Sequence, residues 1–254
     1  MAGRSPDPHA GDDPHGDEPL VTAGTPLDDA DAALVLVHGR GATARSVVDL
    51  GEQLAGDRDV AVSPAESPAA REASGLSLLA PAAAGNTWYP NSFLSPVADN
   101  EPGRTSGLRA VGAAVDRAVE SGIDRDRLLV GGFSQGACLA SEFVARNPTR
   151  YGGIAVFSGG LIGESIDVDD YLADATAAGP EGSTGADGGP LFGTPAFVGC
   201  SDVDPHIPEE RVHETTAVLE ALGADVDERI YEGMGHGIND DEVEAASELV
   251  ASLS

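Results

Sequence analysis

Lysine is absent from this chain of 254 residues, so all 14 of its basic residues are arginine. Against them stand 43 aspartates and glutamates, which give a formal net charge of −29 at pH 7. Without a basic stripe to neutralise phosphates, nucleic acid is excluded as an expected partner. So much negative charge repels itself in dilute salt, but about 1 M salt screens charges beyond roughly 3 Å. We interpret the composition as adaptation to a molar-salt cytoplasm, as in salt-accumulating halophiles; an acidic protein of ordinary cytoplasm is the alternative.

Cysteine and long apolar runs are also scarce. The two cysteines, Cys138 and Cys200, are too few for a disulfide framework and lack the spacing of metal ligands. No apolar run approaches the length of a membrane span, and the N-terminus shows no apolar signal segment. We therefore expect a cytoplasmic protein with free thiols, no bound metal and no membrane association.

Composition divides the chain into three kinds of segment. Residues 1–30 are rich in Asp, Pro and Gly, and this predicts a disordered or loosely attached acidic leader. Residues 31–254 are long enough for a single large domain. Within them, residues 173–189 have low complexity and are predicted to form a surface loop.

Apolar runs alternate with helical periodicity along the predicted domain. Helices are expected over 108–119, Gln135–Arg146, about 208–222 and 243–253, the last capped by Asn239 and Glu242. Strands are expected at Ala32–Val37, 59–62, 127–130, Gly153–Phe157, 194–198 and 226–231. This alternation predicts an α/β fold whose mainly parallel central sheet carries helices on both faces. Functional residues of such sheets collect at the carboxyl ends of the strands.

One candidate nucleophile stands at such an end, in the stretch GGFSQGA. A chain of this composition is expected to contain Gly-x-Ser-x-Gly by chance about 0.3 times, so the pattern alone is weak. Ser134 nevertheless follows a predicted strand and precedes a predicted helix, which is the setting of a nucleophile elbow. Side chains at Gly132 and Gly136 would crowd the neighbouring strand and helix. A serine-containing turn whose glycines serve packing alone is the alternative.

A serine nucleophile needs a base and an orienting acid. His236 lies in a glycine-rich loop after the last predicted strand, where the chain order Ser, Asp, His of α/β-hydrolases places the base. The loop after the preceding strand offers both Asp202 and Asp204. Position along the chain does not choose between these two aspartates.

Four blocks of sequence, in order, resemble the phospholipase/carboxylesterase family of α/β-hydrolases, which includes the acyl-protein thioesterases. GGFSQGA, DPHIP and YEGMGH are similar to the family's GFSQGG, DPxVP and YPGMGH, and HGRG matches its HGxG loop. The resemblance implies the α/β-hydrolase fold without a large lid domain, and chemistry that needs no metal or organic cofactor. It also implies Ser134 as nucleophile, Asp204 as acid, His236 as base, and the backbone amides of Arg40 and Gln135 as the oxyanion hole.

The surroundings of the site depart from the family pattern or leave alternatives open. Arg40 stands where the family often has leucine, so its guanidinium either reaches an anionic substrate or is a solvated surface group. Trp88 and Tyr89 either bound the substrate, as the resemblance implies, or pin a long loop to the domain. His38 is expected to shape the site, and His206 either contacts substrate or packs beside the acid.

Together these features predict a serine hydrolase that cleaves carboxylic esters or thioesters of small to medium acyl groups through an acyl-enzyme. A related hydrolase of lactones or aromatic-degradation products is one alternative, and a non-catalytic binding protein on the same fold is another. The expected partner is a small-molecule substrate, and the protein is expected to be a monomer or a homodimer.

Overall fold

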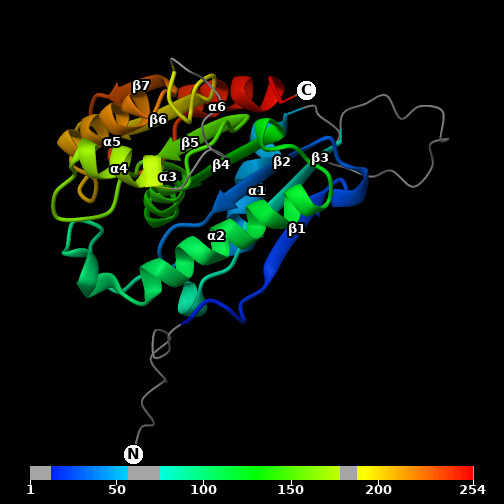
Figure 1. The fold of residues 1–254 in the computed structure, drawn as a ribbon, viewed down its shortest axis with the longest axis horizontal. Coiled ribbons are helices and arrows are strands. Elements are labelled where there is room, and N and C mark those ends of the chain that lie inside the picture. The colour runs from blue at the N-terminus through cyan, green and yellow to red at the C-terminus, as the bar shows by residue number, and fades with distance from the viewer. Residues whose placement is uncertain (1–12, 57–74, 178–187, 254) are drawn as a thin grey trace, which may run out of the picture.

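A central sheet runs through residues 13–56, 75–177 and 188–253, the part of the chain that the computed structural model describes (Figure 1). Within these ranges the sheet has seven strands in the order β1-β3-β2-β4-β5-β6-β7. Only β1 is antiparallel to its neighbour. The strands are β1 Leu20–Gly24, β2 Ala32–Val37, β3 Leu76–Pro81, β4 Leu128–Phe133, β5 Gly153–Phe157, β6 Pro195–Ser201 and β7 Asp225–Tyr231.

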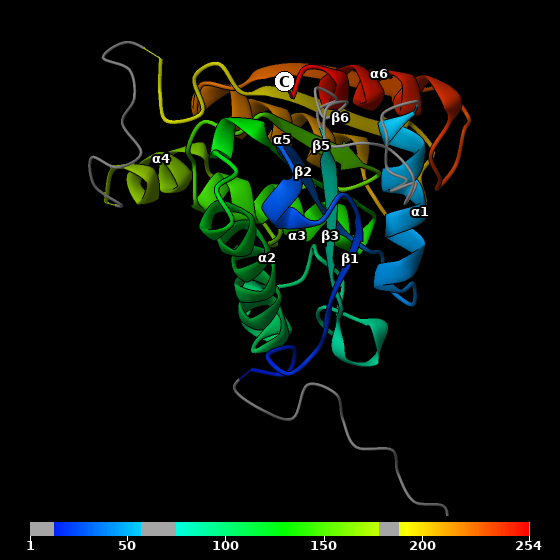
Figure 2. The same ribbon diagram turned by 90° about the vertical axis from the view of Figure 1, so that its right-hand side faces the viewer.

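Helices cover both faces of this sheet, as predicted, and Figure 2 shows α1 and α2 on opposite sides of it. Strand β2 is buried along its whole length, because a parallel strand between two helical layers meets apolar groups on both faces. No separate lid is seen among the described residues. The helices are α1 Ala44–Ala55, α2 Gly103–Glu120, α3 Gln135–Arg146, α4 Val168–Ala177, α5 Glu209–Ala221 and α6 Asp240–Ala251.

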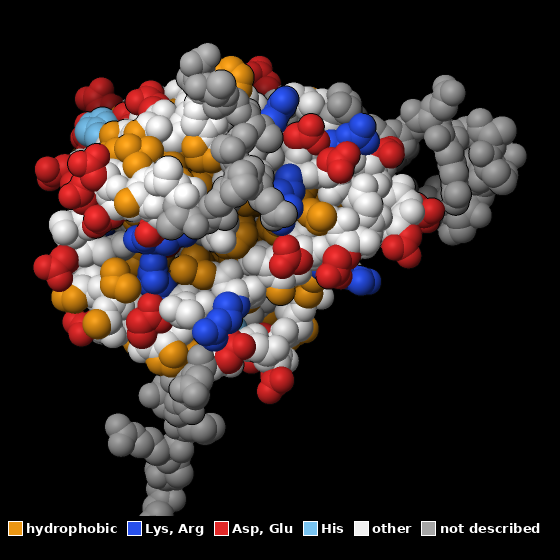
Figure 3. Space-filling model, viewed as in Figure 1, with side chains coloured by type: hydrophobic (Ala, Val, Ile, Leu, Met, Phe, Trp, Pro, Cys, Tyr) orange, Lys and Arg blue, Asp and Glu red, His pale blue; other side chains and the backbone are white. Residues whose placement is uncertain are grey.

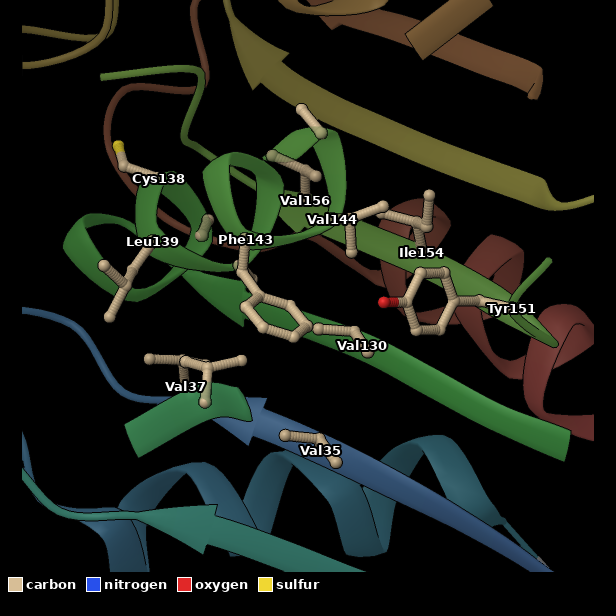
Figure 4. Packing of buried hydrophobic residues seen from close by; sticks show 14 of the residues in the cluster. Val35, Val37, Val130, Cys138, Leu139, Phe143, Val144, Tyr151, Ile154 and Val156 are labelled. Atoms are coloured by element: carbon tan, nitrogen blue, oxygen red, sulfur yellow. The ribbon is translucent and has the colours of Figure 1, made fainter. Parts of the chain in front are cut away.

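Side chains at alternate positions of the strands contribute to two apolar cores, one on each face of the sheet. Val37 of β2 and Val130 of β4 face α3, where Figure 4 shows Phe143 among them. On the opposite face, Leu34 and Leu36 pack with α1 and α6. Because side chains alternate along a strand, β2 contributes to both cores and fixes the loop that follows it.

Acidic side chains stand over much of the periphery of the molecular face in Figure 3. The described arginines are mostly paired with them, as in the contact of Arg229 with Asp227 and Asp241. None of the helices in the described ranges combines the length and the apolar content that a bilayer crossing requires.

The predicted leader is wrong for residues 13–30, while residues 1–12 lie outside the described part. Strand β1 pairs with β3 from Leu20 opposite Pro81 to Gly24 opposite Ser77. His15 is only 2% exposed. This segment is ordered although it has few apolar residues. Distant parts of the chain provide hydrogen-bond partners for its backbone and for the side chain of His15.

Other boundaries also differ from those expected. Residues 173–177 of the predicted surface loop complete α4, and residues 178–187 are not among those described. The strand predicted at 59–62 also falls outside the described residues. By contrast, α6 begins with the predicted capping box, in which Asn239 and Glu242 each accept a hydrogen bond from the other's backbone amide.

Candidate functional site

Ser134 occupies the single residue between the end of β4 and the start of α3. Its φ of 56° and ψ of −122° lie in a region that side chains disfavour, so the turn is strained as an elbow requires. Backbone hydrogen bonds hold the strain in place: the Ser134 amide donates to the carbonyl of Phe157 at 2.9 Å, and its carbonyl accepts from the amide of Cys138 at 3.0 Å.

The glycines around Ser134 permit the close approach of three backbone segments. A Cβ on Gly132 would lie 2.5 Å from the carbonyl oxygen of Val37 and 2.8 Å from the carbonyl carbon of Gly136. A Cβ on Gly136 would also collide with the carbonyls of Val37 and His38. The crowding predicted for these two positions is confirmed, because the end of β2 passes directly beside the turn.

The structure brings Ser134, His236 and Asp204 together from the carboxyl ends of β4, β7 and β6. The Oγ of Ser134 lies 3.0 Å from Nε2 of His236, and Nδ1 of His236 lies 2.7 Å from Oδ2 of Asp204. With Nδ1–H donating to the carboxylate, Nε2 is left free to accept the serine proton.

Asp204, and not Asp202, contacts the imidazole. Its second oxygen, Oδ1, accepts hydrogen bonds from the backbone amides of His206 at 2.8 Å and Ile207 at 3.1 Å. Burial would raise the pKa of the Asp204 carboxyl, but its hydrogen bonds with His236 and these two amides lower the pKa below its ordinary value. Asp202 instead accepts the amide of Gly233 at 2.7 Å and so anchors the loop that carries His236.

The His236 loop bends through two glycines with positive φ, Gly233 at 68° and Gly235 at 79°. The amide of Gly235 donates to Ser201 Oγ at 3.0 Å. The ring of His236 is flanked by Phe133 and His206, each with its ring centroid 4.9 Å away. Hydrogen bonds and ring contacts from neighbouring elements thus hold the loop that carries the imidazole.

The two predicted oxyanion amides lie beside the serine. The loop after β2 passes so close that a Cβ on Gly39 would lie 3.4 Å from Cβ of Ser134. In the described part of the chain, neither the amide of Arg40 nor that of Gln135 donates to another backbone carbonyl. Within this part, both amides thus lack a backbone acceptor, as the predicted oxyanion role requires.

His38 and Trp88 stand behind this loop and are not among the residues that line the cleft. The indole N–H of Trp88 donates to the His38 carbonyl at 2.8 Å. The Ala83 amide donates to Nε2 of His38 at 3.2 Å, so His38 carries its proton on Nδ1 and donates to the carbonyl of Gly39 at 2.9 Å. These contacts fix the backbone immediately before Arg40.

His15, which sequence reasoning missed, extends this buried network. Its Nδ1 accepts the amide of Ala84 at 3.0 Å, so Nε2 carries the proton and donates to the Trp88 carbonyl at 2.8 Å. Burial lowers the pKa of His15 and of His38, and both rings are therefore neutral at pH 7. No sequence motif marks His15, since its partners lie about 70 or more residues away.

Gln135 has a second role beyond its backbone amide. Its side-chain oxygen accepts the amide of Trp88 at 3.0 Å, and its side-chain nitrogen donates to the carbonyl of Tyr89 at 2.9 Å. The residue after the serine therefore fixes the aromatic loop against the start of α3.

An open cleft of about 600 Å³ lies over Ser134. Of the predicted pocket residues, Tyr89 and His206 line this cleft, whereas Trp88 and His38 do not. The residues that line it are Gly39, Arg40, Ala42, Tyr89, Pro90, Asn91, Ser92, Phe93, Phe133, Ser134, Gln135, Cys138, His206, Ile207 and His236.

The guanidinium of Arg40 spans the rim of the cleft. Its Nη2 donates to the carbonyls of Tyr89 at 2.9 Å and Asn91 at 2.7 Å, and its Nη1 donates to the carbonyl of Pro90 at 3.1 Å. Arg40 is therefore more than a solvated surface arginine, because it ties the loop after β2 to the segment that forms one wall.

Glu242 is a fully buried carboxyl on α6, next to the His236 loop. Its Oε2 accepts the amide of Asn239 at 2.8 Å, while Oε1 has no partner within the described residues. The carboxyl packs against Gly199 of β6, which has no side chain to displace it. Burial raises the pKa of Glu242 to about 7.

Comparisons with known proteins agree with this arrangement. The sequence model of the phospholipase/carboxylesterase family matches residues 21–169. A crystal structure of a phospholipase/carboxylesterase from Dyadobacter fermentans is 33% identical, with a TM-score of 0.75, and the match covers 92% of this chain and 96% of that one. This match and the sheet order confirm the predicted α/β-hydrolase fold.

Two curated relatives match over shorter stretches. Acyl-protein thioesterase 1 of Kluyveromyces lactis is 27% identical over 154 residues, 60% of this chain and 60% of that protein. A protein of Arabidopsis thaliana described as a probable carboxylesterase, SOBER1-like, is 26% identical over 161 residues, 62% of this chain and 55% of that protein. The match thus spans about 60% of the length of these relatives.

Proposed function

Because this chain belongs to the phospholipase/carboxylesterase family, we propose that it hydrolyses carboxylic esters or thioesters of small to medium acyl groups through an acyl-enzyme. The observation that carries the proposal is the line of hydrogen bonds from Ser134 through His236 to Asp204. The cleft of about 600 Å³ over Ser134 supports a substrate of modest size.

In this mechanism, Ser134 Oγ attacks the carbonyl carbon of the substrate while Nε2 of His236 accepts the hydroxyl proton. The negative oxygen of the tetrahedral intermediate accepts hydrogen bonds from the backbone amides of Arg40 and Gln135. His236 then protonates the leaving alcohol or thiol, and the acyl group remains on Ser134. A water molecule repeats the same steps, releases the carboxylic acid and restores the serine. Asp204 stabilises the imidazolium throughout.

The test is hydrolysis of p-nitrophenyl acetate and butyrate in molar KCl, the condition that the acidic composition favours. Ser134→Ala should abolish turnover and labelling by a fluorophosphonate, which reacts with an activated serine. Ser141→Ala is a matched control on the same helix, because the Ser141 hydroxyl only donates to the Cys138 carbonyl at 3.1 Å. Undiminished turnover by Ser134→Ala would overturn the proposal.

Two further outcomes distinguish the alternatives. Hydrolysis of dienelactones well above that of simple esters would assign the protein to lactones or aromatic-degradation products. A folded wild-type protein that neither turns over esters nor accepts the fluorophosphonate would instead be a binding protein on this fold.

A further inference from the structure

The cleft over Ser134 has the opposite charge character from the rest of the molecule. The chain carries 43 acidic residues and a net charge of −29. Yet none of the described residues that line the cleft is Asp or Glu. Asp204 is near, but its side chain is buried and engaged by His236 and two amides. The titratable or cationic groups on the cleft wall include Arg40, His206 and His236.

Arg40 supplies a fixed positive charge at this wall. Across the described residues no carboxylate forms an ion pair with it, whereas Arg104 pairs with Glu142 and Arg211 with Glu214. The three carbonyls that hold the Arg40 guanidinium are dipoles, so they orient the group and leave its full charge uncancelled. These carbonyls accept three N–H groups, which leaves Nε–H and one Nη1–H for another acceptor.

Because the Arg40 guanidinium is held in a fixed orientation, its charge can discriminate between substrates. A free arginine loses side-chain freedom when it binds an anion, but Arg40 is already held by the segment that forms the wall. A neutral side chain at this position would offer the same backbone amide without the charge. The arginine therefore adds a property that the proposed chemistry at Ser134 does not itself require.

We infer that Arg40 makes the protein selective for esters or thioesters that carry a carboxylate on the acyl chain or on the leaving group. The inference rests on the proposed hydrolysis and names its substrate class. An anionic group seated at Arg40 gains a charge-assisted hydrogen bond that a neutral substrate of the same shape lacks. Such a contact corresponds to about a tenfold preference or more in kcat/KM.

The experiment compares mono-4-nitrophenyl glutarate with 4-nitrophenyl pentanoate, which have the same acyl length and leaving group. At about 1 M KCl the screening length is roughly 3 Å, so only a direct contact discriminates between them. The wild type should prefer the glutarate, and Arg40→Gln should lower that preference about tenfold. Arg40→Lys should restore part of it. Arg117→Gln, on an exposed position of α2, is the matched control and should leave the ratio unchanged.

A second pair, 4-acetoxybenzoate and its methyl ester, places the carboxylate on the leaving group. Loss of preference in Arg40→Gln for either pair supports the inference and identifies the side that Arg40 contacts. Equal hydrolysis within both pairs by the wild type, or an equal fall for charged and neutral esters in the variant, would overturn it. Neither of those results affects the proposed hydrolysis, which fails only if the wild type cleaves none of the four esters or if Ser134→Ala still cleaves them.

Discussion

The two walls of the cleft are built in different ways. One, the acid–base wall, presents His206 and His236 on the loops after β6 and β7, with Asp204 buried behind them, and exposed or part-buried hydrogen bonds hold it. The other, the amide wall, consists of the backbone of residues 38–40 and the side chains of Trp88 and Gln135 behind it. Buried hydrogen bonds hold this second wall from several directions.

The difference follows from what each wall does in the proposed reaction. An imidazole that accepts and returns a proton needs an exposed nitrogen and an orienting carboxylate. Backbone amides that stabilise an oxyanion need fixed positions before the reaction begins. The chemistry of the first wall therefore depends on the hydrogen bond between Asp204 and His236, and the second wall depends on a buried network that reaches back to His15.

The largest expected effect comes from breaking the acid–base wall. Asp204→Asn removes the negative charge that orients and stabilises the His236 imidazolium, so kcat should fall by roughly 10⁴-fold. Asp202→Asn is the matched control, because Asp202 anchors the loop through Gly233 and does not contact the imidazole. Its kcat should stay within about tenfold of the wild type. Steady-state hydrolysis of p-nitrophenyl butyrate measures both, and comparable losses would remove Asp204 from its proposed role.

A smaller effect is expected from loosening the amide wall. Trp88→Phe keeps most of the ring but loses the N–H that binds the His38 carbonyl. Loss of a whole oxyanion donor costs about 10²–10³ in kcat, so its partial misplacement should cost about 10-fold to 100-fold, with KM changed little. A rise in KM at constant kcat would show instead that Trp88 serves substrate binding.

His15 tests how far the amide wall extends. His15→Ala should also lower kcat about tenfold, since the Trp88 carbonyl and the Ala84 amide lose their partner. His15→Gln, which can donate to one and accept from the other, should recover part of the loss. His213→Gln, at an exposed histidine of α5, is the control and should retain full activity. Equal activity of His15→Ala and the wild type would place the N-terminal segment outside the site.

The last prediction concerns the stability of the protein, not its activity, beneath the acid–base wall. The pKa of Glu242 is about 7 in the folded protein against 4.5 for the ordinary carboxyl, so the folded state binds an extra proton between these values. Stability from this group is complete below pH 4.5 and is lost as pH rises through about 7. Glu242→Gln keeps the acceptor for the Asn239 amide and does not titrate.

Relative to Glu242→Gln, the wild type should therefore lose up to about 3 kcal/mol of unfolding free energy between pH 5 and pH 8. Urea unfolding of both proteins at the two pH values measures this difference. The other ionisable groups, including neighbouring Asp241, are common to both proteins and cancel in the comparison. A difference that does not depend on pH would show that Glu242 stays ionised in the folded state.

Local patterns predicted one wall better than the other. Strands β2 and β5, helix α3 and the cap at Asn239 follow from periodicity and residue type, and the chain order of Ser134, Asp204 and His236 follows from the carboxyl ends of parallel strands. These features depend on neighbours in sequence or on a general rule of the fold.

The amide wall depends on contacts between distant residues. His15 meets Trp88 across 73 positions, and Trp88 meets His38 across 50. Strand β1 is short and only partly buried, and β3 supplies its backbone partners. No local pattern distinguishes such residues from a solvated leader or a loose loop. For this reason the sequence predicts a disordered or loosely attached leader for residues 13–30 and leaves two roles open for Trp88.

The strained turn at Ser134 has a consequence for how this protein can be improved. With φ at 56°, any side chain at this position holds the backbone in a disfavoured conformation, and glycine would relax it. Ser134→Gly should therefore produce a more stable but inactive protein. Selection for heat resistance alone would favour losing the proposed nucleophile, so engineering of this fold must screen for turnover and stability together.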